Sequence, residues 1–103
     1  MAYKLIITNR ADELLERSIY HIINNFKNEQ AAKHLLNEID KLYDRMEENP
    51  FQFPDCRDPY LKSKGYKETV VSGMDYIIVF RIEEEEVRVL GIFHQLENYK
   101  EKL

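Results

Sequence analysis

Near the start of the chain, the spacing of hydrophobic residues changes from every second position to every third or fourth. Residues 3–8 alternate between apolar and polar positions and are rich in β-branched side chains, which predicts a short strand. From Asn9 onward, apolar residues recur every three or four positions, which predicts an amphipathic helix with Asn9 as its cap and Asp12 in its first turn. The apolar face consists of Leu14, Leu15, Ile19, Ile22, Ile23 and Phe26.

A second helical pattern follows almost at once. Asn28 is predicted to cap it, and it ends before the pair Asn49-Pro50, because the residue before a proline disfavours helix. Its apolar face consists of Ala31, Ala32, Leu35, Leu36, Ile39, Leu42, Tyr43 and Met46. Only Lys27 and Asn28 separate the two patterns, so the two helices are expected to form an antiparallel hairpin.

The second half of the chain has the pattern of a proline-rich loop followed by strands. Residues 49–63 contain three prolines, so we expect an irregular loop there. Its apolar anchors are expected to be Phe51, Phe53, Tyr60 and Leu61. Three strands are then predicted at 66–71, 74–82 and 87–93, joined by turns at 72–73 and 83–86. The whole order predicts one α+β domain over residues 1–103, with a helical hairpin on a mainly antiparallel sheet.

Alternation along the last two strands predicts which side chains face the helices. The helix-facing set is Tyr76, Ile78, Phe80, Val87, Val89 and Phe93. The opposite set is Ile77, Val79, Arg81, Arg88, Leu90, Ile92 and His94. Because this second face is also apolar in its middle, we expect a cover for it. The tail 95–103, with Leu96, Tyr99 and Leu103, is expected to cover part of it and a partner protein the rest.

Composition narrows the class of protein. The net charge is −4, but residues 83–86 are four consecutive glutamates, so the remaining residues balance in charge and no broad basic surface is expected. A local basic excess between Arg57 and Lys67 is interpreted as a solvated loop. Cys56 is the single cysteine, and no segment resembles a signal peptide or a membrane span, which favours a cytoplasmic protein. No metal-ligand spacing is present, so neither metal nor cofactor is expected.

Four local stretches carry a resemblance to a known family. They are MEENP at 46–50, GYKE at 65–68, YIIVFRI at 76–82 and GIFHQ at 91–95. Together with the order of elements, they make the chain similar over nearly its whole length to the RelE/ParE toxins of bacterial type II toxin–antitoxin systems, the plasmid stabilisation type. The strand that ends in His94 resembles the ParE side of this superfamily.

The resemblance implies a growth-inhibiting toxin that a cognate antitoxin neutralises by folding a disordered segment onto it. Two targets stay open. A ParE-like toxin would inhibit DNA gyrase by binding, without chemistry of its own, and the His94 ending and the lack of a basic surface favour this hypothesis slightly. Its candidate contact surfaces are the helical hairpin and the segment 94–103.

The alternative is a RelE-like mRNA interferase that cuts messenger RNA on the ribosome, and whether the chain is an enzyme depends on this choice. Here Arg81 would neutralise phosphate, and His94, Lys64 or Lys67 would act as general base or acid. Tyr99 would stack on a base or assist proton transfer. Residues 95–98 read QLEN where RelE-like chains carry a basic cluster, which weakens this hypothesis.

Each candidate also has a structural interpretation. Arg81 could pair with a glutamate of the adjacent turn, His94 could cap the sheet through a backbone bond, and Tyr99 could anchor the tail. His21 and His34 are expected at surface or boundary positions. Cys56 has no histidine near it in sequence, so it is not expected to be a nucleophile.

Overall fold

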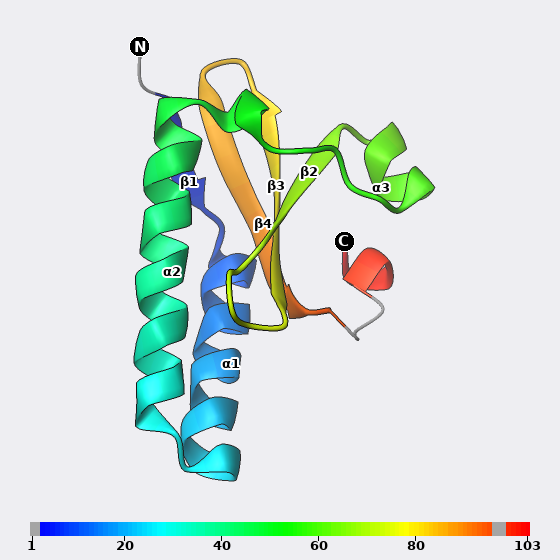
Figure 1. Cartoon of the computed structure of the whole chain (residues 1–103). Helices are drawn as coiled ribbons and strands as arrows, with labels where there is room; N and C mark the ends of the chain where they lie inside the picture. Colours follow the sequence, from blue (N-terminus) through cyan, green and yellow to red (C-terminus); the bar gives the residue numbers. More distant parts are fainter. Residues whose placement is uncertain (1–2, 96–98) are drawn as a thin grey trace.

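The computed structural model describes residues 3–95 and 99–103. A hairpin of two helices packs on one side of a four-stranded sheet (Figure 1). The sheet order is β1-β4-β3-β2, with β1 parallel to β4 and the other pairs antiparallel. The main elements are β1 (Lys4–Ile7), α1 (Asn9–Phe26), α2 (Glu29–Glu48), β2 (Tyr66–Val70), β3 (Tyr76–Glu83) and β4 (Glu86–His94). The predicted α+β fold, with its hairpin and C-terminal meander, is confirmed.

The N-cap of the first helix lies one residue earlier in the chain than predicted. Thr8, and not Asn9, is the N-cap of α1, because its hydroxyl accepts a bond from the Ala11 amide at 3.1 Å and donates to the Val89 carbonyl at 2.8 Å. One hydroxyl thus caps the helix and ties it to β4. Asn28 caps α2 as predicted, by accepting from the Ala31 amide at 3.0 Å.

The proline-rich segment contains more regular structure than its sequence suggests. A 3-10 turn, η1, spans Pro50–Gln52, and a short helix, α3, spans Pro59–Ser63. Each begins with a proline, since the first turn of a helix needs no amide donor there. Phe53 and Leu61 are buried anchors as expected. Phe51 and Tyr60 are not, with 60% and 55% of their surfaces exposed.

A β-bulge changes the faces of the last strand. Val79 pairs with Gly91 and Phe80 pairs with Val89, so Leu90 is an extra residue on β4. Beyond this point the alternation shifts by one position. Ile92 therefore packs in the core beneath the helices and Phe93 in the core on the opposite face, the reverse of the sequence prediction.

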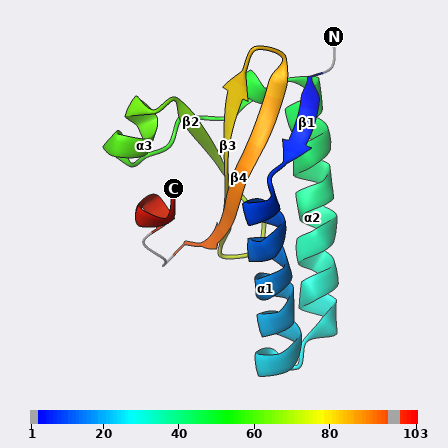
Figure 2. The same ribbon diagram turned by 180° about the vertical axis from the view of Figure 1, so that it is seen from behind.

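The second face of the sheet is covered by the chain itself. Ile77, Val79 and Phe93 are fully buried there. The cover comes from Cys56 and Leu61 of the loop region and from Tyr99 and Leu103 of the tail. Figures 1 and 2 show α3 and the C-terminal turn η2 (Tyr99–Lys102) beside the sheet, away from α2. The tail contact is confirmed, and Leu96 lies outside the described residues. The chain itself covers the apolar middle of this face, at Ile77, Val79 and Phe93, so a partner is not needed there.

Candidate functional site

The predicted ribonuclease residues do not form one site. In the strand register, Arg81 of β3 lies opposite Tyr66 of β2, on the face of the sheet away from the helices. His94 of β4 lies opposite Tyr76 of β3, beyond the bulge and on the helix side. Five residue steps along β3 separate these two positions, which corresponds to about 17 Å along the strand. Arg81 and His94 therefore lie at opposite ends of the strand pair and on opposite faces.

The two lysines have structural partners. Lys67 lies on the helix side, where its Nζ donates to the Phe53 carbonyl at 3.1 Å and forms an ion pair with Asp55 at 3.2 Å. Lys64 lies near the other face, with its Nζ 5.0 Å from the centre of the Tyr60 ring. Lys67 thus holds the loop against the sheet, and Lys64 also donates to the Leu103 carbonyl of the tail at 3.4 Å.

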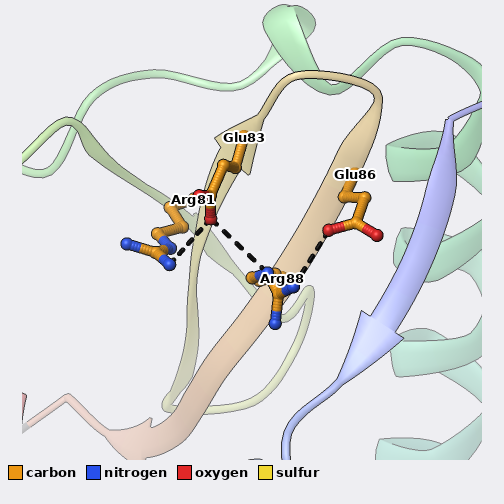
Figure 3. Close-up of polar contacts among 4 residues, drawn as sticks. All are labelled: Arg81, Glu83, Glu86 and Arg88. Atoms are coloured by element: carbon orange, nitrogen blue, oxygen red, sulfur yellow. Dashed lines mark hydrogen bonds and ion pairs between the residues drawn. The ribbon is translucent and has the colours of Figure 1, made fainter.

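Arg81 belongs to a compact cluster of alternating charges (Figure 3). Its Nη2 lies 2.8 Å from Glu83, and the same glutamate oxygen lies 3.5 Å from Nε of Arg88. Arg88 also pairs with Glu86 at 3.0 Å. Arg81 and Arg88 are directly opposite in register, so Glu83 separates two like charges. The simpler interpretation of Arg81, an ion pair with a glutamate near the turn, is confirmed.

Tyr99 anchors the tail. Its ring stacks on Phe93, with centroids 5.5 Å apart and an interplanar angle of 20°. Burial is the main cause that raises the pKa of Tyr99, and the negative charge of Glu68 adds to it. A phenol with a raised pKa gives up its proton less readily, so this environment favours the anchoring role over proton transfer.

A buried carboxylate lies beneath the loop, at a position that the sequence did not single out. Glu68 is 3% exposed and accepts bonds from the amide of Arg57 at 3.2 Å and from its Nε at 3.1 Å. Burial first, and Glu68 second, raise the pKa of the Cys56 thiol to about 12. The place of Glu68 on the apolar face of an alternating strand is the sequence signal that could have revealed it.

A basic cleft lies between α1 and the end of β4. It has a volume of about 480 Å³. Its lining residues are Arg10, Leu14, Arg17, Ser18, His21, Tyr76, Ile92, His94 and Lys102. No carboxylate is among these described lining residues. The sequence did not predict this site because its walls come from distant segments, although the spacing of positions 10, 14, 17 and 21 does indicate a single helical stripe.

An apolar groove lies on the outer side of the helical hairpin. Its lining consists of Leu15, Glu16, Ile19, Tyr20, Ile23, Asn24 and Leu36, around a volume of about 390 Å³. Tyr20 is 70% exposed and Leu36 41%. A contiguous apolar surface of this kind on a small protein is typical of a protein-binding site.

Two further classes of site are absent along residues 3–95 and 99–103. Within these ranges, no three His, Cys, Asp or Glu side chains are placed to hold a metal ion. None of the helices described is both long enough and apolar enough to cross a membrane.

Comparison with known proteins places the chain in a family. Residues 5–99 match the family model described as the ParE toxin of the type II toxin-antitoxin system parDE. This chain belongs to the ParE toxin family. It is therefore a type II toxin on the ParE side of the RelE/ParE superfamily.

The fold of this ParE family member is similar to that of a solved structure. The structure titled "Chromosomal ParDE TA system from P. aeruginosa" superposes with a TM-score of 0.72 at 16% sequence identity, over 90% of this chain and 96% of that chain. At this identity the likeness concerns the fold. No curated protein matches the sequence significantly.

Proposed function

We propose that this ParE-family toxin inhibits DNA gyrase by binding to it in the cytoplasm, and that a cognate antitoxin neutralises it. The separation of Arg81 from His94 is the observation that favours inhibition by binding over RNA cleavage. A ribonuclease needs its base, acid and phosphate-binding cation around one phosphodiester, each within about 3 Å of the atom it serves. Residues about 17 Å apart on opposite faces cannot meet this condition together.

The ion pairs of Arg81 support the same choice. Its guanidinium pairs with Glu83, and Glu83 and Glu86 together balance the charges of Arg81 and Arg88. A phosphate approaching this cluster would meet two carboxylates as well as two guanidinium groups. The cluster therefore offers little net attraction for the backbone of an RNA.

The target can be tested with purified toxin. Gyrase supercoiling of a relaxed plasmid should be inhibited, while messenger RNA on ribosomes should stay intact. Arg81→Ala should keep the inhibition, because Arg81 has a structural partner and lies outside both the basic cleft and the apolar groove. In cells, thymidine incorporation should fall before methionine incorporation after induction.

The opposite pattern would establish the ribonuclease alternative. Ribosome-dependent RNA cleavage that disappears in Arg81→Ala, together with unaffected gyrase, would contradict the proposal. A folded Arg81→Ala protein, checked by circular dichroism, is the control for this comparison.

The antitoxin is proposed to place an apolar segment in the groove between α1 and α2. Tyr20→Asp should therefore weaken antitoxin binding by about 2 kcal/mol or more, the loss typical of an aromatic contact at the centre of an interface. The dissociation constant, measured by titration calorimetry, checks this expectation. Phe51→Asp is the matched control, since Phe51 is a similarly exposed aromatic residue outside the groove. Equal losses in both variants would place the antitoxin elsewhere.

A further inference from the structure

The basic cleft has two walls, formed by side chains of α1 and of the β3–β4 strand pair. Arg10, Arg17 and His21 extend from one stripe of α1 and form its first wall. The opposite wall is Tyr76 with His94, whose rings meet edge to face at 5.5 Å. Leu14, buried beneath the same stripe, packs against the end of β4 and keeps the two walls together.

The charge of the cleft contrasts with that of the whole protein. The chain carries −4, yet Arg10, Arg17 and Lys102 bring three cations to a cleft whose described lining contains no acid. Among the described residues, the guanidinium groups of Arg10 and Arg17 form no ion pair. This arrangement differs from the cluster at Arg81, where every arginine has a glutamate. The guanidinium charges of Arg10 and Arg17, which no described carboxylate pairs with, attract an external anion.

We propose that this cleft binds the phosphodiester backbone of a nucleic acid. Arginine is the side chain best suited to phosphate oxygens, which its planar group can bind in pairs. Arg10 and Arg17 are seven residues apart, about 10.5 Å along the helix axis. Along the axis of a DNA duplex, where successive phosphates of one strand rise by about 3.4 Å each, this separation corresponds to about three nucleotides.

Aromatic groups in the lining favour a nucleic acid over an acidic peptide. His21 and His94 line the cleft together with the cations. Sites for single strands combine cations that follow the backbone with rings on which bases stack. The proposal goes beyond gyrase binding, because it concerns a contact with nucleic acid that the toxin makes by itself.

Binding can be measured by fluorescence anisotropy with a labelled short DNA duplex, a DNA single strand and an RNA single strand, at about 50 to 200 mM salt. The wild-type toxin should bind with an affinity that falls as salt rises. For the duplex, Arg10→Gln/Arg17→Gln should weaken binding and reduce the slope of log K against log salt by about 1.8, since each phosphate that is no longer neutralised lowers the slope by about 0.9.

A matched double variant distinguishes an effect of the cleft on binding from an effect of the protein's net charge. Lys33→Gln/Lys41→Gln removes the same charge from exposed positions of α2 and should leave the slope unchanged. Equal effects of the two double variants, or no binding of any of the three probes, would overturn the proposal. Displacement of the probes by polyglutamate as effectively as by unlabelled nucleic acid would overturn it as well, in favour of an acidic protein partner. The probe that binds most tightly identifies the kind of nucleic acid. Because the assay contains no gyrase, its result does not depend on whether gyrase is the target.

Discussion

At pH 8, a thiol reagent is expected to modify Cys56 about a thousandfold more slowly in the folded toxin than in the toxin unfolded in urea. The reactive form of cysteine is the thiolate, and its fraction falls tenfold for each unit of increase in pKa. The fold raises the pKa of Cys56 from 9.0 to about 12, chiefly by burial and then by the charge of Glu68. Burial adds a steric barrier, since only 1% of the residue is exposed.

The rate can be followed by the release of a coloured thiol from an aromatic disulfide reagent. Cys56→Ala is the control, because it removes the single cysteine and should abolish the signal. Fast modification of the folded protein would mean that the loop and tail open readily over the sheet. The Cys56→Ala toxin should remain toxic, since the thiol lies outside the basic cleft and the apolar groove.

Phe93→Ala is expected to lower the free energy of unfolding by about 3 to 5 kcal/mol, the usual loss for a large aromatic side chain removed from a core. Phe93 is fully buried on the second face of the sheet, and Tyr99 stacks on it. Its ring also lies over Gly91, where a Cβ atom would come within 2.5 Å of two ring carbons. The glycine and the ring therefore fit each other closely, and removal of the ring leaves a cavity beside the backbone.

Urea denaturation with linear extrapolation measures this loss. Phe51→Ala provides the comparison, because Phe51 is 60% exposed and its removal should change stability by less than about 1 kcal/mol. In Phe93→Ala, Cys56 should also react faster with the thiol reagent, since the same ring supports the tail over the loop. A loss below about 1 kcal/mol in Phe93→Ala would contradict the anchoring role of this ring.

The order and type of the main elements follow from local patterns in the sequence. The helical hairpin followed from two amphipathic patterns separated by two residues, and the meander followed from three alternating segments with short turns. These features are local, because each depends on neighbours two to four positions away. The family, too, was evident from the order of elements and four short stretches, and the family match over residues 5–99 confirms it.

The positions of the candidate site residues depend on contacts between distant segments. One extra residue, Leu90, reverses the faces of Ile92, Phe93 and His94, and alternation alone cannot reveal such a bulge. As a result, His94 lies with Arg10 and Arg17 in a cleft, far from Arg81. Strand register and helix packing bring together residues more than seventy positions apart in the chain. Local periodicity contains no information about such contacts, so the sequence predicted the fold but not the basic cleft.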